Sequence, residues 1–298
     1  MYVISGSTHQ RLGASLAEEM DAEFCGVVNR HFPDGERYIR ILMDVDGQDV
    51  VVVQNTFPDK KIVELLLILQ AVKEAGAKTV TCVIPYMGYS RQERIFQSGE
   101  ARSAKAIAGV LGSMCNRIFT INVHTPAVLD FFGCEAKDIN GSREVVRYLK
   151  GFKPDMVVAP DEGSKDRCIL AANMLKVPVH VMKKVRIDGR PVETSSGPVD
   201  VKGCTAVILD DIISTGGTIA TAANILRDGG ADRILAACTH GLFIEDAANR
   251  LRVCDDILSS DTLEGVYTRF SVAPAIADAL YCFGKGRSSL KMASLEKE

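Results

Sequence analysis

The sequence predicts an α/β protein with mostly parallel sheets, because short apolar runs alternate with helical patterns along the chain. Runs such as Val50-Val-Val-Val-Gln are apolar on both faces, as strands are when helices cover both sides of a parallel sheet. The intervening helical patterns end at stop signals, for example Gly76 after the first and Gly229-Gly230 after the fifth. Together these patterns indicate strand–helix–strand units.

The elements follow in order. After a strand-like amino terminus we expect strands at residues 50–54, 79–84, 117–122, 156–159, 177–182, 205–209 and 233–238. We expect helices at residues 60–75, 102–111, 143–149, 165–175, 218–228 and 275–281. Polar and glycine residues around 138–142 mark a boundary, beyond which the pattern starts again. The sequence therefore predicts two domains, residues 1–140 and 141–298, without a clear sequence repeat.

Composition narrows the class of protein. A length of 298 residues allows two cores, and the net charge of −3 disfavours nucleic-acid or anionic-membrane partners. No apolar run approaches the roughly 20 residues of a membrane span. The nine cysteines contain no C-x-x-C pair, which argues against a disulfide framework or a zinc site. With no signal-peptide pattern at the amino terminus, we expect a cytoplasmic protein that acts on small molecules.

The most informative stretch is residues 206–218, where an apolar run ends in two carboxylates, followed by hydroxyls, glycines and a helix. Free backbone N–H groups at a helix amino terminus favour phosphate, and ionised Asp side chains accept hydrogen bonds from hydroxyl groups. A ligand with vicinal hydroxyls and a phosphate is a ribose 5-phosphate, although a buried strand with a polar turn is the alternative. The candidate residues are Asp210, Asp211, Ser214, Thr215, Gly216, Gly217 and Thr218.

Two further segments suit phosphate chemistry. Residues 157–165 also run from an apolar strand through a turn into a helix, and Asp161 is placed to reach a Mg²⁺ on a diphosphate. By itself this segment fits an ordinary strand–turn–helix equally well. Lys184 and Arg186 share one face of an extended segment, so both cations can contact a transferring phosphoryl group. Residues 187–198, polar and rich in Gly and Pro, have the composition of a lid.

The stretch at 206–218 resembles the phosphoribosyl diphosphate (PRPP) loop of type I phosphoribosyltransferases and of PRPP synthases. Other segments resemble PRPP synthases alone. Residues 32–41 are similar to their nucleotide loop, residues 89–94 to their Arg-Gln motif, and residues 182–186 to the start of their catalytic loop. Residues 124–132, 239–243 and 271–274 resemble three more family segments. The resemblance runs from about residue 5 to residue 280 in the family's order.

This resemblance implies two tandem phosphoribosyltransferase-like domains and the transfer of a diphosphoryl group from Mg²⁺–ATP to ribose 5-phosphate, giving PRPP and AMP. It also implies a homo-oligomer, because in the family a neighbouring subunit supplies the Asp-x-Glu loop. The implied ATP contacts are Phe32, Asp34, Gly35, Glu36, Arg91 and Gln92; the metal residues are His124 and Asp161; and the catalytic residues are Lys184 and Arg186, of which Arg186 also contacts ribose 5-phosphate.

The chain departs from the family pattern at three places. Asn122 stands two residues before His124, where many members carry Asp, and Ser164 stands where a second glycine is common. Residues 260–262 only approximate a Thr-Asn-Thr segment. The Thr-Gly-Gly-Thr form of the loop and the short chain lean towards archaeal-type members. Two other interpretations stay open: a phosphoribosyltransferase that consumes PRPP, and a non-catalytic relative that regulates an active partner.

Overall fold

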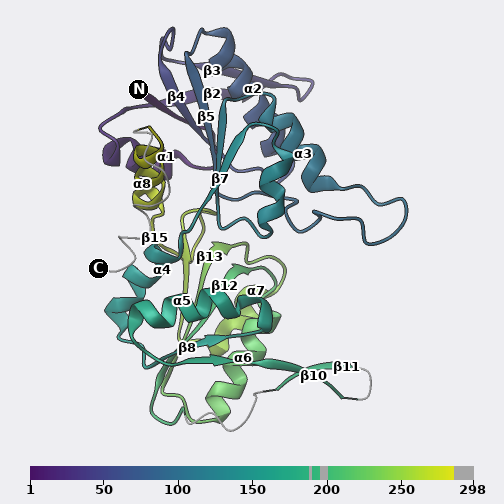
Figure 1. Ribbon diagram of the computed structural model, residues 1–298, viewed down its shortest axis with the longest axis vertical. Coiled ribbons are helices and arrows are strands. Elements are labelled where there is room, and N and C mark those ends of the chain that lie inside the picture. Colours follow the sequence, from purple (N-terminus) through teal and green to yellow (C-terminus); the bar gives the residue numbers. More distant parts are fainter. Residues whose placement is uncertain (188–189, 195–200, 285–298) are drawn as a thin grey trace. The chain divides into compact units, whose positions relative to one another are not determined.

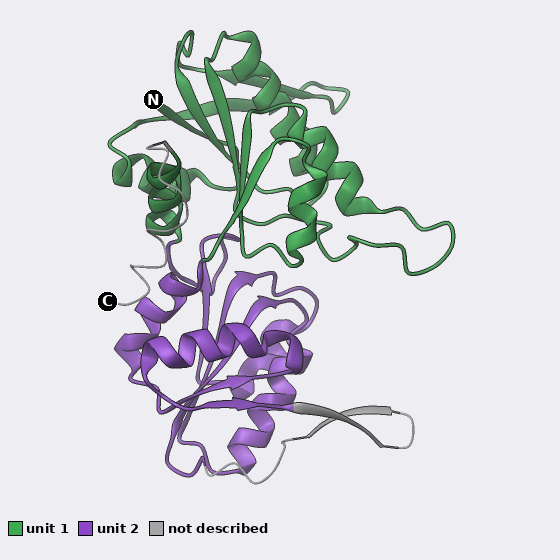
Figure 2. Cartoon of the chain, viewed as in Figure 1, with its two compact units in different colours: residues 1–140, 272–298 green, residues 141–271 purple. Residues whose placement is uncertain are grey.

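The computed structural model describes residues 1–187, 190–194 and 201–284, and its chain forms two compact units (Figures 1 and 2). Unit 1 takes residues 1–140 and 272–298, and unit 2 takes residues 141–271. The division expected from the sequence also breaks after residue 140, but it leaves the end of the chain in the second domain. The structure differs there because the apolar side of the last helix packs in unit 1.

Unit 1 is a seven-stranded sheet in the order β3-β2-β1-β4-β5-β6-β7. Its strands pair in parallel, except for the antiparallel β2–β3 hairpin at one edge. Its elements are β1 (Tyr2–Ser5), α1 (Gln10–Glu19), β2 (Glu23–His31), β3 (Arg37–Ile41), β4 (Asp49–Val53), α2 (Lys60–Glu74), β5 (Thr79–Ile84), α3 (Ser103–Gly112), β6 (Arg117–Ile121), η1 (Pro126–Phe131), β7 (Glu135–Ile139) and α8 (Ala273–Gly284).

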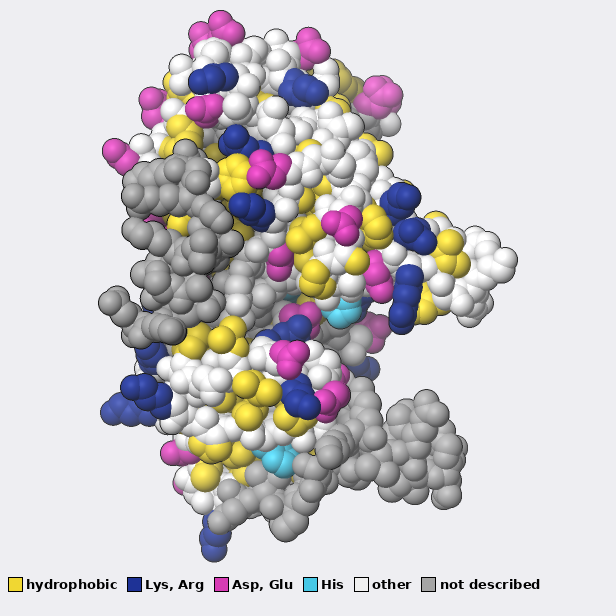
Figure 3. Space-filling model, in the orientation of Figure 1, with side chains coloured by type: hydrophobic (Ala, Val, Ile, Leu, Met, Phe, Trp, Pro, Cys, Tyr) yellow, Lys and Arg dark blue, Asp and Glu magenta, His cyan; other side chains and the backbone are white. Residues whose placement is uncertain are grey.

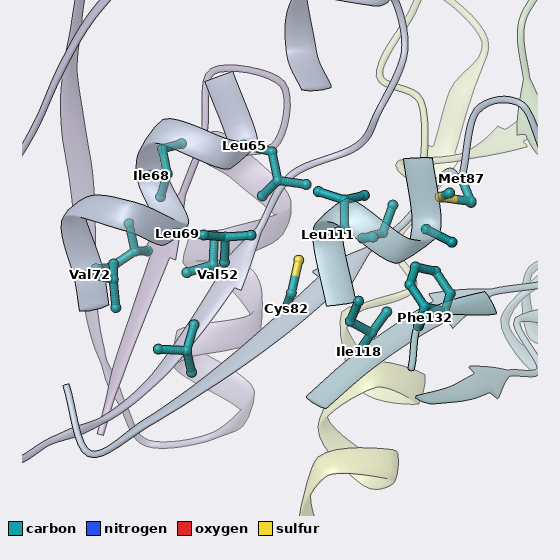
Figure 4. Close-up of a cluster of buried hydrophobic side chains, with 14 of the residues drawn as sticks. Val52, Leu65, Ile68, Leu69, Val72, Cys82, Met87, Leu111, Ile118 and Phe132 are labelled. Carbon is teal, nitrogen blue, oxygen red and sulfur yellow. The ribbon is translucent and has the colours of Figure 1, made fainter. Parts of the chain in front are cut away.

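Helices cover both faces of this sheet, so alternate residues of its strands enter two separate cores. Val52 packs with Leu65 of α2 and Leu111 of α3, and Figure 4 shows these side chains gathered over one face. Val53, the next residue of β4, packs on the other face with Ile276 of α8. The doubly apolar runs of the sequence thus become central strands.

Unit 2 repeats this plan with a six-stranded sheet in the order β15-β14-β13-β12-β8-β9, all paired in parallel, and a separate β10–β11 hairpin. Helices α4 and α5 pack on one face and α6 on the other. Its elements are α4 (Ser142–Leu149), η2 (Lys150–Phe152), β8 (Met156–Ala159), η3 (Glu162–Ser164), α5 (Lys165–Leu175), β9 (Val179–Val181), β10 (Lys183–Ile187), β11 (Arg190–Thr194), β12 (Thr205–Ile213), α6 (Gly217–Asp228), β13 (Arg233–Gly241), α7 (Ala247–Arg250), η4 (Leu251–Val253), β14 (Asp256–Ser260) and β15 (Thr268–Phe270).

Each sheet has one point where the direction of strand order reverses. In unit 1 the reversal lies between β1 and β4, and in unit 2 it lies between β8 and β12. Loops that leave the carboxyl ends of such neighbouring strands pass to opposite faces of the sheet and leave a crevice between them. The fold therefore predicts one ligand position in each unit.

Every strand and helix named from the sequence overlaps an element of the structure. The strand expected at 205–209 is longer, since β12 continues to Ile213 and takes both carboxylates of the candidate motif into the sheet. Among the described residues, the helices and strands that were not anticipated are α1, α7, β2, β3, β7, β11, β14 and β15, together with the 3₁₀ helices.

Surface and composition agree with the expected small-molecule protein. Within the described residues, the structure contains no helix of the length and apolar character that a membrane span needs. Acidic and basic side chains are interspersed on the face shown in Figure 3. All nine cysteines are free thiols.

The carboxyl end of α3 packs so closely on the following 3₁₀ helix that only glycine fits. A Cβ at Gly112 would lie 1.7 Å from the carbonyl oxygen of Phe132, whereas one at Gly109 would meet its nearest neighbour at 3.7 Å. We expect Gly112→Ala to destabilise the protein by about 1–3 kcal/mol through overpacking. Gly109→Ala, in the same helix, should be neutral or stabilising. Thermal unfolding of both variants checks this, and equal unfolding temperatures would contradict it.

Candidate active site

The two phosphate-loop candidates of the sequence lie at the strand-order reversal of unit 2. β8 and β12 are parallel neighbours, with Ala206 paired to Met156 and Ile208 to Val158. The loops that follow these strands therefore start at the same edge of the sheet, with no strand between them. The structure brings together Asp161 and the 210–218 motif, as a ligand with two phosphate groups requires.

The loop after β12 is built to present backbone amides. The carbonyl oxygen of Ser214 accepts a hydrogen bond from the Ile244 amide, and that of Thr215 accepts one from the Arg250 guanidinium, at 3.1 and 3.0 Å. No side chain caps the amino terminus of α6. Because the first amides of a helix have no intrahelical acceptor, they are available to an anion there.

The two glycines of this loop have different roles. Gly216 has a φ of +75°, and a Cβ there would lie 3.0 Å from Leu251. Gly217 begins α6, and a Cβ there would meet no atom within 4 Å. The left-handed conformation allowed by the sequence is thus needed at Gly216, while Gly217 leaves space at the helix terminus.

The loop after β8 is held by a reciprocal cap. The Asp161 carboxylate accepts hydrogen bonds from the Ser164 amide at 3.0 Å and the Ser164 hydroxyl at 3.2 Å. The Ser164 hydroxyl in turn accepts a hydrogen bond from the Asp161 amide at 3.3 Å. Ser164, a departure from the family pattern, therefore fixes the side chain predicted to bind metal. Among the described residues, no three His, Cys, Asp or Glu side chains converge as a metal site.

A residue that the sequence analysis missed lies on the acidic pair. Arg167 of α5 forms ion pairs with Asp210 at 2.7 Å and with Asp211 at 2.9 Å. Arg167 and Asp210 are 43 residues apart in the chain, so no local sequence pattern predicts their contact. The available signal was only that a basic side chain occurs in the first turns of the helix after one candidate loop.

Burial and charge perturb this pair. Burial, with the adjacent Asp211 charge, raises the pKa of Asp210 to about 7, and the Arg167 guanidinium opposes that rise. Near neutral pH the Asp210 carboxyl group is therefore close to its midpoint of titration, beside the Arg167 guanidinium. An ionised Asp210 is the form that accepts hydrogen bonds from ligand hydroxyls.

In unit 1, the residues predicted to contact ATP lie on loops at the carboxyl edge of the sheet. Phe32, Asp34, Gly35 and Glu36 form the exposed turn of the β2–β3 hairpin, in which Asp34 accepts a hydrogen bond from the Glu36 amide at 3.0 Å. Gly35 has a φ of +94°.

The Arg-Gln motif follows β5. Arg91 is exposed, and the Gln92 side chain accepts a hydrogen bond from Ser103 at the start of α3 at 3.0 Å. Within one chain, β1 and β4 separate the hairpin from β5, a spacing of about 14 Å across three strand intervals. The two predicted nucleotide segments of unit 1 thus leave strands that are not neighbours in the sheet.

His124 is exposed on the turn after β6. Asp138 of β7 accepts hydrogen bonds from the Val123 amide at 2.9 Å and the Thr120 hydroxyl at 2.6 Å, and so holds that turn. Burial raises the pKa of Asp138 to about 6. Asn122, the departure noted in the sequence, has a φ of +43°.

Lys184 and Arg186 lie on β10, an extended segment as expected, where their backbone partners are Glu193 and Pro191 of β11. The predicted lid falls partly on residues 188–189 and 195–198, which lie outside the described residues.

Known proteins match over nearly the whole chain. The family model of the N-terminal domain of ribose phosphate pyrophosphokinase matches residues 1–114, and that of the phosphoribosyl transferase domain matches residues 137–272. Ribose-phosphate pyrophosphokinases of the archaea Methanopyrus kandleri and Methanothermobacter thermautotrophicus are each 38% identical, covering 94% and 93% of this chain and 98% and 99% of theirs.

A crystal structure of phosphoribosylpyrophosphate synthetase from Mycobacterium smegmatis superposes with a TM-score of 0.81 at 28% identity, covering 95% of this chain and 98% of that one. The match confirms the predicted fold, two phosphoribosyltransferase-like domains with mostly parallel sheets.

The Asp210–Arg167 contact makes a pH prediction. If ionised Asp210 accepts hydrogen bonds from the ligand hydroxyls, ribose 5-phosphate affinity should fall as the pH drops through about 7. Arg167 lowers the pKa of Asp210, so Arg167→Gln should move the midpoint of that fall to higher pH. Calorimetric titrations of both proteins between pH 5.5 and 8.5 check this. The ligand's own phosphate titrates near pH ~6 in both series, so it serves as an internal control. Superimposable profiles would contradict the assignment.

Proposed function

The chain belongs to the ribose-phosphate pyrophosphokinase family, and we propose on that basis that it transfers the β,γ-diphosphoryl group of ATP to ribose 5-phosphate. The observation that carries the proposal is the match of residues 1–114 to the N-terminal domain of ribose phosphate pyrophosphokinase, because the loops that meet in unit 2 also fit a phosphoribosyltransferase. The product, PRPP, supplies activated ribose for nucleotide biosynthesis.

The reaction forms one bond and breaks one. The 1-hydroxyl oxygen of ribose 5-phosphate attacks the β-phosphorus of ATP and loses its proton, while the oxygen between the α- and β-phosphorus leaves with AMP. In such transfers the protein acts mainly by positioning and by stabilising charge.

Unit 2 is proposed to hold ribose 5-phosphate. Asp210 and Asp211 accept hydrogen bonds from the ribose hydroxyls, and the loop of Ser214, Thr215, Gly216, Gly217 and Thr218 binds the 5′-phosphate. The open space at Gly217 and the uncapped start of α6 support this assignment.

Unit 1 is proposed to supply nucleotide contacts through Phe32, Asp34, Gly35, Glu36, Arg91 and Gln92. A homo-oligomer is part of this proposal, because in the family a neighbouring subunit supplies the hairpin loop; two strands lie between the hairpin and β5 in this chain. A neighbouring copy then provides the hairpin residues, as in the family.

Mg²⁺ is the proposed cofactor, and bound to the ATP phosphates it neutralises their charge. The oxygen donor of Asp161 suits this hard cation, and Mg²⁺ commonly binds through one or two carboxylates together with substrate phosphates. Asp161 with its Ser164 cap, and His124 on the turn held by Asp138, are the chain's proposed contributions.

The free thiols agree with a reducing, cytoplasmic location.

The first test identifies the product. With a divalent metal, ATP and ribose 5-phosphate, we expect AMP, and none when either the metal or ribose 5-phosphate is omitted. Chromatographic separation of the nucleotides measures it. Formation of ADP would instead indicate a simple kinase. Consumption of PRPP with a nucleobase, without formation of AMP, would favour a phosphoribosyltransferase. Absence of any turnover while the ligands still bind would favour a regulatory relative.

The second test concerns Lys184. If its ammonium contacts the phosphoryl oxygens mainly during transfer, Lys184→Ala should lower kcat by about 10²–10³ and leave ATP affinity nearly unchanged. Arg186→Ala should behave in the same way. Lys183 belongs to the other face of the predicted extended segment, so Lys183→Ala is the matched control and should be mild. Steady-state kinetics with direct ATP titration decides. A Lys183 effect equal to that of Lys184 would require a different catalytic pair.

A further inference from the structure

A fully buried carboxylate in unit 1 has no part in the mechanism above. Glu64 of α2 has no exposed side-chain surface. Its Oε1 accepts a hydrogen bond from the Ser7 amide at 2.7 Å, and its Oε2 accepts one from the Ser7 hydroxyl at 2.9 Å. Lys61 lies 3.1 Å and Arg37 3.2 Å from the same Oε2. Four donor groups therefore converge on one internal anion.

The interactions keep this carboxylate charged. Burial raises the pKa of Glu64, but the hydrogen bonds from Ser7 and Lys61 outweigh it and leave the pKa below its ordinary value. A buried charge that is paired and hydrogen-bonded holds its partners firmly, because separating them exposes an unpaired charge.

The position of Ser7 in the fold shows which loop of unit 1 the Glu64 carboxylate occupies. Ser7 follows β1 at the strand-order reversal of unit 1, the place that the loop after β8 takes in unit 2. In unit 2 that loop is the proposed site of the diphosphate. In unit 1 the amide and hydroxyl of the corresponding loop are taken by Glu64. The reversal of unit 1 is thus closed by a side chain of the protein.

The cluster is joined to the nucleotide hairpin through Arg37. Arg37 is the first residue of β3, immediately after Glu36, and pairs with His31 at the last rung of the β2–β3 ladder. Its guanidinium also donates a hydrogen bond to the Asn29 side chain of β2 at 2.5 Å. One side chain thus connects both strands of the hairpin to the buried carboxylate.

We propose that the Glu64–Arg37 pair is a positioning device for the nucleotide, which fixes the base of the β2–β3 hairpin so that Asp34 and Glu36 are presented in one geometry. This inference rests on the proposed function of that hairpin. β3 is an edge strand, paired on one side only, so the sheet alone restrains its turn weakly. Binding ATP to an unrestrained turn would cost ordering entropy, which the anchor removes in advance.

Arg37→Met tests the proposal with little threat to folding, since Ser7 and Lys61 still hold Glu64. We expect ATP affinity, measured by calorimetry, to weaken about tenfold, because the hairpin loses its ion pair to the buried Glu64. The KM for ATP should rise in parallel, with kcat and the KM for ribose 5-phosphate within about twofold of wild type. Arg37→Lys should recover part of the affinity. Arg40→Met, at an exposed position of the same strand, is the matched control.

A second measurement reports on the hairpin itself. Amide hydrogen exchange at residues 32–36 should accelerate in Arg37→Met and not in Arg40→Met. This readout needs no turnover, so it stands even if the wild type forms no AMP and the proposed function fails. Glu64→Gln should give the same acceleration, and if it does not fold, the Arg37 variants carry the test.

Three results would overturn the proposal. These are unchanged hairpin exchange in Arg37→Met, an equal loss of affinity for ATP and ribose 5-phosphate, and dissociation of the oligomer in light scattering. The second would mark the pair as a general stabiliser of the fold, and the third would mark it as an assembly contact.

Discussion

Parallel pairing of β8 with β12 is the constraint on which the candidate site depends. Because the strands run in the same direction, their carboxyl ends reach one edge, and because the strand order reverses between them, α5 and α6 leave towards opposite faces. A slip of one residue in this register would turn Asp210 to the other face of the sheet. Ala206 and Ile208 pack in the core on one face and Val207 and Leu209 in the core on the other, and this packing of particular side chains fixes the register.

The same burial that fixes the register makes the acidic pair costly. Asp210 and Asp211 lie within β12, beside each other, where desolvation and mutual repulsion both oppose charge. Arg167 compensates by contacting both carboxylates. A ligand whose hydroxyls approach Asp210 must therefore share that carboxylate with a guanidinium already in place. Arg167 is therefore part of the proposed recognition of the ligand hydroxyls, together with the two acids.

What the sequence could predict was local. Apolar runs, glycine stops and the 206–218 motif each depend on residues close in the chain, so the central strands, their helices and the phosphate loop were predictable. Helix α1 was not predicted because Gly13, a poor helix former, interrupts its pattern. A Cβ at residue 13 would lie 1.7 Å from the Ser5 hydroxyl, so tertiary packing requires glycine there. The family resemblance supplied the ATP and catalytic residues, which no local pattern specifies.

Contacts between residues far apart in the chain could not be predicted from local sequence patterns. Arg167 contacts Asp210 and Asp211, which are 43 and 44 positions away in the chain. Glu64 is a single acidic residue in an apolar helix, and from the sequence such a residue is expected to face solvent. Neither side chain has a spacing rule, because each partner is set by how strands are ordered in the sheet. The packing of α8 in unit 1 is of the same kind, since its periodicity says that it is amphipathic but not which sheet it covers.

The two units share one arrangement of strands and loops but use it differently. In both, a loop leaves the strand at the order reversal with amide and hydroxyl donors. In unit 2 the Asp161 carboxylate and the Ser164 amide and hydroxyl form hydrogen bonds with each other inside the loop. In unit 1 the corresponding donors, the amide and hydroxyl of Ser7, instead form hydrogen bonds to the Glu64 carboxylate of α2. We therefore attribute the difference between the proposed substrate site of unit 2 and the proposed anchor of unit 1 to the carboxylate that α2 brings, since the order of the parallel strands is the same in both.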